Sequence, residues 1–168
     1  NNCSFKLNIE KCYFSPRLSS ERLRIAKLVK KNEKILVMFS GIGVYPIVIA
    51  RNSKVSEIYG IEINKVAYKY AEENLIINKV NNIKLIFGDV RKVVPKLKIK
   101  FDRIIMPLPK GADKYLDVIV SKIKKNGVIH YYDFLREEEI PKNGLEKIRK
   151  KIKKFKLLKF VKCGQLAP

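Results

Sequence analysis

Two glycines follow the first strongly apolar stretch of the chain, residues 34–39. Gly41 and Gly43 would let the backbone approach a ligand closely, because glycine carries no Cβ. A dinucleotide-binding fingerprint would place a third glycine at position 46, which is Pro46 here. The pattern therefore disfavours a pyrophosphate cofactor, whereas a cofactor without phosphates, such as S-adenosylmethionine, needs only the close approach.

Acidic residues end the next two apolar stretches. Glu62 lies 21 residues after Gly41, and a carboxylate at that spacing suits the ribose hydroxyls of a nucleoside cofactor. Asp89 has two interpretations: it accepts the adenine amino group, or it caps the helix that follows. Because parallel strands end at one edge of a sheet, Gly, Glu and Asp at three successive strand ends predict a single adenosine-shaped cleft.

A proline pair follows the fourth apolar stretch, residues 101–106. Pro107 and Pro109 fix the backbone and remove two N–H donors, so that nearby carbonyls can face a ligand. In methyltransferases that act on base nitrogens, a short proline motif lies at this strand end beside the target nitrogen. A plain rigid turn into the next helix is the alternative.

The elements that must position these residues alternate along the chain. Apolar stretches predict strands at 3–9, 34–39, 57–63, 82–89, 101–106, 127–134 and 156–163. Helical periodicity predicts helices at 21–31 with Ser19 as N-cap, and at 45–52, 65–79, 90–97, 111–126 and 143–155, with Gly127 just past the fifth. The alternation predicts an α/β, Rossmann-like fold, a mostly parallel twisted sheet with helices on both faces.

We expect two units in the chain. Residues 1–17 would be the end of a small preceding domain or a linker, and residues 18–168 the cofactor-binding catalytic domain. A sheet of this kind normally finishes with an antiparallel strand. Since the chain stops at residues 166–168, we expect that final strand to be missing.

The charge predicts a polyanionic partner. The 168 residues carry 37 Lys and Arg against 16 Asp and Glu, a net charge of +21, which favours RNA or DNA over a membrane. A lysine-rich genome bias is the alternative, although it does not explain the few acids. The basic stretch 146–155 would contact phosphates or be a solvated face, and Lys110 is a further phosphate-contact candidate.

Other features set the surroundings of the protein. Cys3, Cys12 and Cys163 share no C-x-x-C spacing, so we expect no zinc or other metal and a reducing, cytoplasmic location. No apolar run approaches the ~20 residues of a membrane span. The lone His130 is predicted to be structural, and the chain to be a monomer.

Several motifs together resemble the archaeal and eukaryotic tRNA (guanine-37-N1)-methyltransferases, over nearly the whole chain. They are residues 13–22 (YFSPRLSSER), 38–43 (MFSGIG), 102–106 (DRIIM), 108–110 (LPK) and 127–132 (GVIHYY). The first is the most specific, since generic methyltransferases lack it. The resemblance implies a class I methyltransferase fold, S-adenosylmethionine as cofactor, and methyl transfer to N1 of guanosine 37 in the tRNA anticodon loop.

The resemblance also implies roles for individual residues. N1 of guanine must lose its proton to attack a methyl group, and Glu21 would be the base that takes it. By composition alone, Glu21 could simply stabilise the first turn of its helix. The implied catalytic residues are Glu21, Arg22, Arg17, Pro107 and Pro109. The implied cofactor contacts are Tyr13, Phe39, Ser40, Gly41, Ile42, Gly43, Glu62, Ile63, Asp89, Val90 and Pro107.

Two positions depart from the family pattern, and they keep other functions open. The family usually has an acid where this chain has Val37 and an Asn, which helps place the guanine, where it has Pro107. Some archaeal members methylate the tricyclic wyosine precursor at the same tRNA position. A sister family, which tends to lack the Arg17-Leu18 pair and the Leu-Pro-Lys run, transfers the aminocarboxypropyl group instead. An inactive RNA-binding module is the alternative of another class, and +21 disfavours a small-molecule methyltransferase.

Overall fold

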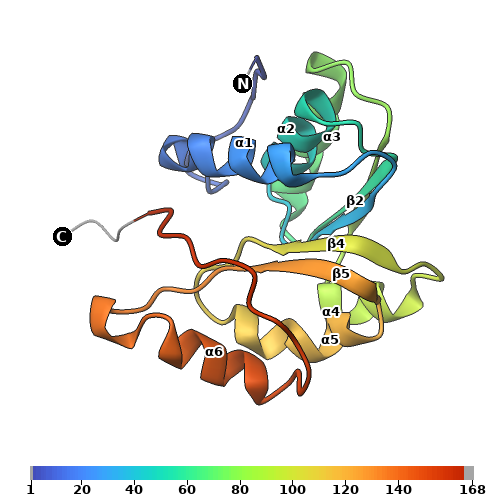
Figure 1. Cartoon of the computed structure of the whole chain (residues 1–168). Helices are drawn as coiled ribbons and strands as arrows, with labels where there is room; N and C mark the ends of the chain where they lie inside the picture. The colour runs from blue at the N-terminus through green and yellow to red at the C-terminus, as the bar shows by residue number, and fades with distance from the viewer. Residues whose placement is uncertain (1, 165–168) are drawn as a thin grey trace.

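The computed structural model describes residues 2–164, which form a five-stranded sheet with helices on both faces (Figure 1). The strands are β1 (Lys34–Val37), β2 (Glu57–Glu62), β3 (Ile83–Phe87), β4 (Phe101–Met106) and β5 (Ile123–Tyr131). Their order is β3-β2-β1-β4-β5 and every pairing is parallel. The order reverses between β1 and β4, where open α/β sheets leave a crevice beyond the carboxyl ends of the strands. The predicted Rossmann-like α/β fold is confirmed.

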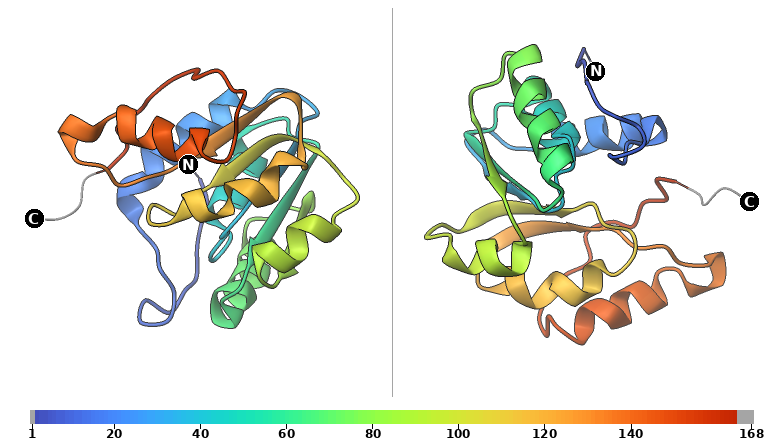
Figure 2. Two further views of the ribbon diagram at one scale, coloured as in Figure 1. Left: turned by 90° about the horizontal axis from the view of Figure 1, so that it is seen from below. Right: turned by 180° about the vertical axis from the view of Figure 1, so that it is seen from behind.

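Helices cover the sheet in two layers, as the two views of Figure 2 show. One face carries α1 (Ser19–Leu28), α2 (Val44–Asn52) and α3 (Lys65–Ile77), and the other carries α4 (Val90–Val93), α5 (Leu116–Val120) and α6 (Lys142–Arg149). Short 3₁₀ turns are η1 (Pro16–Leu18), η2 (Val94–Lys96), η3 (Ala112–Tyr115) and η4 (Glu137–Glu139).

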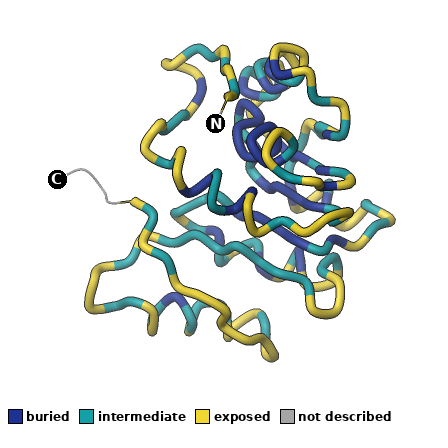
Figure 3. Tube along the Cα trace, turned by 45° about the horizontal axis from the view of Figure 1, so that its top comes forward, coloured by how far each residue is buried: buried dark blue, intermediate teal, exposed yellow. Residues whose placement is uncertain are grey.

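Alternating side chains of the central strand fill both layers. Ile35 and Val37 belong to the core beneath α1–α3, whereas Leu36 and Met38 belong to the core over α4 and α5. All four are fully buried, which is why this stretch is continuously apolar. Burying each such side chain contributes roughly 1.5–3 kcal/mol. In Figure 3 the buried part of the trace runs through the middle of the molecule.

The strand predicted at 3–9 is wrong, although its alternation has a structural cause. Cys3, Phe5 and Leu7 do pack against the first core. The backbone between them pairs with side-chain amides instead of a strand: Lys6 N–H donates to Asn74 Oδ1 (2.8 Å), and Asn74 Nδ2 donates to the Lys6 carbonyl (3.1 Å). Asn78 bonds both backbone groups of Ser4 in the same way. The alternation of apolar residues shows which side chains of this segment are buried. It cannot show that the backbone pairs with side chains of a helix and not with a strand.

The helix predicted at 111–126 is wrong in its second half. The chain leaves α5 at Val120, and β5 starts four residues before the predicted strand, at Ile123. Ile123 pairs with Phe101, a register shift follows, and pairing resumes at Val128. Asn126 takes a positive φ of 63° inside this irregularity. Gly127 therefore belongs to a bulged strand and not to a helix end.

Three further boundaries also differ from the prediction. Ser19 is the first residue of α1 and Leu18 its N-cap, because the preceding η1 turn already places Ser19 in helical conformation. The helix predicted at 143–155 ends at Arg149, and residues 156–163 form no strand. The chain end, where a final strand was expected to be missing, lies outside the described residues. The division between 1–17 and 18–168 stays a prediction.

A buried arginine ties the amino ends of the sheet together. The Arg103 guanidinium on β4 donates to both carboxylate oxygens of Glu33 (2.8 and 3.0 Å) and to the Leu28 carbonyl (2.8 Å). Its third nitrogen lies 2.7 Å from His130 Nε2 on β5. Burial and the nearby Arg103 lower the pKa of His130 to about 3. The ring is therefore neutral and accepts from Arg103, which agrees with a structural role.

We expect His130 to make stability depend on acid. Its pKa lies near 3 in the folded chain and near 6.5 when unfolded, so the unfolded chain binds the extra proton between these values. The stabilisation is complete above pH 6.5 and falls as the pH decreases, by roughly 2 kcal/mol at pH 5. Urea unfolding measures the free energy of unfolding at pH 7 and pH 5. The decrease between these two pH values should be smaller in His130→Gln than in the unaltered chain, by roughly 2 kcal/mol. An identical pH difference in both proteins would contradict the assignment.

Candidate active site

The loop after β1 is turned so that its backbone faces the carboxyl edge of the sheet. Phe39, Gly41 and Gly43 all take positive φ values, of 54°, 56° and 85°. Met38 N–H donates to the Ile105 carbonyl (3.0 Å) and Ser40 N–H to the Ile61 carbonyl (2.9 Å), which fixes the loop between β4 and β2. A Cβ built on Gly41 would meet nothing within 4 Å. Glycine is needed there for the left-handed backbone, and open space lies beside it.

Hydrogen bonds connect the three predicted strand ends. Glu62 Oε2 accepts from Gly41 N–H (2.6 Å), and its other oxygen accepts from Asn64 N–H (2.7 Å). The Glu62 carbonyl accepts from Gly88 N–H (2.8 Å), one residue before Asp89. The sequence prediction that Gly41, Glu62 and Asp89 lie along one edge therefore agrees with the geometry. Each carboxylate oxygen of Glu62 has a second lone pair with which to accept a ligand hydroxyl.

Asp89 acts as the N-cap of α4. Its Oδ1 accepts from Arg91 N–H (2.8 Å), and the next residue, Val90, is buried. The capping interpretation thus describes its contact in this structure. Ile63, in contrast, is 62% exposed directly after Glu62. An apolar side chain left open beside a polar strand end offers a flat contact for a purine ring.

The proline corner closes the edge on the other side of β1. Leu108 N–H donates to the Met106 carbonyl (2.8 Å), and the Pro109 carbonyl accepts from Phe134 N–H (3.1 Å), which ties the corner to the segment after β5. Phe39 packs edge-on against Tyr115, with ring centroids 5.0 Å apart. Pro107 and Pro109 are half-buried and Lys110 is exposed. The corner is a fixed wall next to the turned loop.

Glu21 lies in a buried polar cluster. Arg24 donates to both of its oxygens (2.6 and 2.8 Å), and the Tyr132 hydroxyl donates to Oε1 (2.6 Å). The Tyr45 hydroxyl donates to that of Tyr132 (3.1 Å). Burial raises the pKa of Tyr45 to about 12 and raises the pKa of Tyr132 as well, so both stay protonated donors. Tyr45 lies two residues after Gly43, so the cluster connects the Glu21 carboxylate to the glycine loop.

Two buried side-chain atoms lack a hydrogen-bond partner among residues 2–164: Arg22 Nε and Ser40 Oγ. The Arg22 guanidinium lies over the rings of Phe14 (5.3 Å) and Tyr45 (5.6 Å), and burial lowers its pKa. Unsatisfied buried polar groups are few in native proteins and often mark functional positions. Both residues were predicted site residues, Arg22 on α1 and Ser40 in the loop after β1.

The structure does not bring every predicted residue into the cluster. Tyr13 is 81% exposed, and Arg17 is exposed on η1. The sequence did not indicate the other members of the Glu21 cluster: Arg24 and Tyr132, which bond Glu21, and Tyr45, which bonds Tyr132. The spacing of Glu21 and Arg24, three residues apart on a predicted helix, could have shown the first contact. Tyr132 belongs to the 127–132 motif, but both tyrosines lie on elements distant from Glu21, and no local signal shows that they join its cluster.

A family model for the TRM5/TYW2 methyltransferase domain matches residues 1–159. The chain belongs to this family. Across residues 2–164, every helix is too short or too polar to span a membrane. Within the same residues, no group of three or more His, Cys, Asp or Glu side chains is placed to hold a metal ion.

Relatives in the TRM5/TYW2 family carry different activities in their names. The tRNA (guanine(37)-N(1))-methyltransferase Trm5b of Pyrococcus abyssi is 42% identical over 92% of this chain and 45% of its own length. The tRNA 4-demethylwyosine(37)-methyltransferase Taw21 of Saccharolobus solfataricus is 41% identical over 79% and 50%. The aminocarboxypropyltransferase for 4-demethylwyosine of Methanocaldococcus jannaschii is 37% identical over 88% and 58%. The chain spans about half the length of these relatives.

Solved structures agree with the family assignment. Trm5b from Pyrococcus abyssi superimposes with a TM-score of 0.81 at 42% identity, over 89% of this chain and 44% of that one. TYW2 of M. jannaschii, in complex with AdoMet, gives 0.81 at 35% over 90% and 68%. A complex of aTrm5 and tRNALeu gives 0.75 at 34% over 90% and 46%.

The unsatisfied Ser40 hydroxyl should make Ser40→Ala neutral for stability or stabilising by up to about 1 kcal/mol, since a buried hydroxyl without a partner costs roughly 1–3 kcal/mol. Asn74→Ala is the matched comparison, because Asn74 is fully buried and its amide bonds Lys6 and the Ile42 carbonyl in the glycine loop (3.0 Å). It should lose about 2–4 kcal/mol. Urea unfolding measures both, and a Ser40→Ala loss above 1 kcal/mol would contradict the assignment.

Proposed function

We propose that the chain binds S-adenosylmethionine at the carboxyl edge of its sheet and transfers the methyl group to N1 of guanosine 37 in tRNA. The observation that carries the proposal is that Glu62 bonds both Gly41 and Gly88 at the carboxyl edge of the sheet. From the same glycine loop, Tyr45 on α2 connects through Tyr132 to the buried Glu21 carboxylate. The names of the relatives support the reaction and the tRNA partner. The AdoMet-bound structure of a 35%-identical relative supports the cofactor.

The residues at the edge fit this cofactor. Glu62 has the carboxylate that ribose hydroxyls need, the space beside Gly41 is open, and Ile63 offers an exposed apolar contact for the purine. Ser40 supplies a hydroxyl that lacks a partner among the described residues. When bound, the sulfonium supplies an electrophilic methyl group.

In this proposal, Glu21 takes the proton from N1 of the guanine. Arg24 and Tyr132 donate hydrogen bonds to its two oxygens. A carboxylate has about four lone-pair sites, so these three bonds leave room to accept the proton. Tyr132, backed by Tyr45, fixes the orientation of the carboxylate relative to the glycine loop. Holding base, nucleophile and methyl group in line supplies much of the acceleration, because the transfer is an in-line displacement.

Arg22 and the proline corner would hold the nucleotide. The Arg22 guanidinium lies over two aromatic rings, and its Nε has no hydrogen-bond partner in the part of the chain that the structure describes, which suits a phosphate or a base carbonyl. Pro107 and Pro109 give a rigid wall for the target ring. Arg17 and Tyr13 lie at the surface and would meet RNA only at the mouth of the cleft.

Methylation of the tricyclic wyosine precursor at the same tRNA position is the second candidate function. Its specific support is Taw21, which is 41% identical to this chain. Mass spectrometry of the nucleoside formed from unmodified tRNA and from precursor-containing tRNA separates the two methylations, and an added aminocarboxypropyl group would indicate the third activity in the family.

Glu21→Gln should lower the single-turnover rate of methyl transfer by about 10²–10⁴, because the amide cannot take the N1 proton. Affinity for S-adenosylmethionine, measured by calorimetry, should stay within about twofold. Tyr132→Phe keeps the base and loses one hydrogen bond, so its rate should fall less. Glu138→Gln, an exposed change, is the control. A Glu21→Gln rate equal to that of the unaltered chain would reject Glu21 as the base.

A further inference from the structure

The segment that follows α6 is the most basic stretch of the chain. Residues 149–162 contain eight basic side chains and no acidic one. They are Arg149, Lys150, Lys151, Lys153, Lys154, Lys156, Lys159 and Lys162. All eight are exposed. Among the described residues, the only ion pair they form joins Lys162 to Glu137 (2.9 Å). The positive charge of this segment is therefore almost uncompensated within the described fold.

The segment begins in the turns that end α6, continues without a helix or strand, and lies on the outside of the molecule. After Arg149 the chain forms no further helix or strand up to residue 164, and it runs from α6 back past the sheet toward α1 (Figure 1, Figure 2). Phe155 and Phe160 lie between the lysines and are 39% and 49% exposed. Lysines interleaved with exposed aromatic rings are what single-stranded RNA binds, through phosphates and through base stacking.

The far end of the segment reaches the Glu21 carboxylate. Val161, Lys162 and Cys163 line a hollow of about 300 Å³ together with Ser20, Glu21 and Arg24. A Cβ on Gly164 would lie 3.8 Å from Leu18. Burial, followed by the nearby Glu21, raises the pKa of Cys163, in agreement with this contact. The basic segment therefore ends beside Glu21, the carboxylate proposed to take the proton from the guanine.

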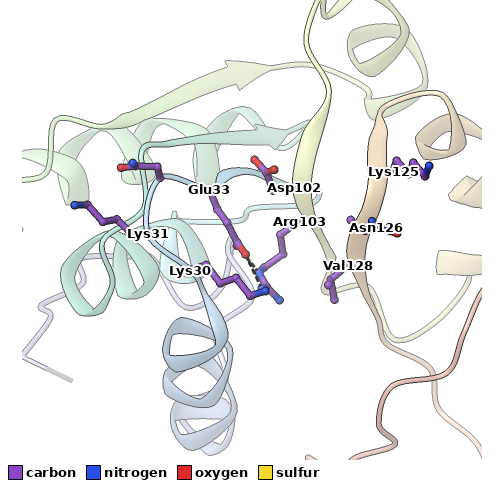
Figure 4. A pocket seen from close by; sticks show the side chains of 10 residues that line it. Lys30, Lys31, Glu33, Asp102, Arg103, Lys125, Asn126 and Val128 are labelled. Atoms are coloured by element: carbon purple, nitrogen blue, oxygen red, sulfur yellow. Dashed lines mark hydrogen bonds and ion pairs between the residues drawn. The ribbon is translucent and has the colours of Figure 1, made fainter.

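A second basic region serves as a comparison. At the amino edge of the sheet, Lys30, Lys31 and Lys125 surround a hollow of about 280 Å³, where Glu33 and Asp102 also lie (Figure 4). Both carboxylates are already paired, with Arg103 and Lys124. Acidic groups therefore interrupt this region, and it lies at the edge opposite to the glycine loop.

We propose that residues 149–162 form a track for the RNA backbone, whose phosphates meet the lysines while the chain of nucleotides leads the target base to Glu21. The inference rests on the proposed function for the identity of that base. The charge of the segment favours RNA here over a membrane surface, because the basic residues follow one linear stretch of chain that ends beside the Glu21 carboxylate. The track is thus an interaction surface separate from the cofactor cleft.

The test compares two charge-matched variants of the whole chain. One carries Lys150→Gln, Lys151→Gln, Lys153→Gln and Lys154→Gln. The control carries Lys30→Gln, Lys31→Gln, Lys100→Gln and Lys125→Gln, all exposed and without ion pairs among the described residues. Binding of an unmodified tRNA transcript is measured against salt. The track variant should bind at least about tenfold more weakly at 0.15 M salt. The slope of log K against log salt concentration should be smaller by about 3 in the track variant, and it should change by less than about 1 in the control.

Equal losses in the two variants, or no loss in the track variant, would overturn the inference. Lysine acetylation of the unaltered chain gives a readout free of folding effects: tRNA should protect Lys150–Lys154 and leave Lys30, Lys31 and Lys125 reactive. Protection of the amino edge alone would also overturn it. Methyl transfer is assayed separately, so that track-dependent binding without transfer would reject the proposed function and leave the track standing.

Discussion

The Glu62 carboxylate holds the candidate site together. It accepts from the N–H of Gly41 on one side and of Asn64 on the other, so that the end of β2 fixes both the glycine loop and the start of α3. Without this acceptor, the loop would lose its charge-assisted hydrogen bond at Gly41 and would be held only by its backbone bonds and by Asn74. The backbone carbonyl of the same residue accepts from Gly88 N–H, so Glu62 also connects the glycine loop to the end of β3.

Neighbours from distant parts of the chain hold the residues of the candidate site in place. Glu21 depends on Tyr132, 111 residues away, and the glycine loop depends on Asn74 through the Ile42 carbonyl. Such contacts cost conformational freedom, which the two apolar cores on the faces of the sheet offset. Arg22 Nε and Ser40 Oγ are two buried polar atoms that residues 2–164 leave without a hydrogen-bond partner.

The strand-end residues could be predicted from the sequence, because parallel topology forces Gly41, Glu62 and Asp89 to one edge. The resemblance pointed to Glu21, which composition alone would have left as a helix-start acid. Long-range and irregular features could not be predicted. Asn74 and Asn78, at the end of α3, take the place of a strand partner for residues 3–9. The bulge at Asn126 has the composition of a helix end, and Tyr132 reaches Glu21 only through the fold.

The central claim is that one cleft at the carboxyl edge receives the cofactor. Amide NMR during titration with S-adenosylmethionine tests it most directly, because backbone N–H groups of Gly41 and Asn64 bond Glu62 and report on any ligand there. We expect shifts concentrated at residues 39–43, 62–64 and 88–91. Shifts confined to the amino edge, at residues 30–33 and 125–128, or saturating cofactor without shifts at the first three segments, would contradict it.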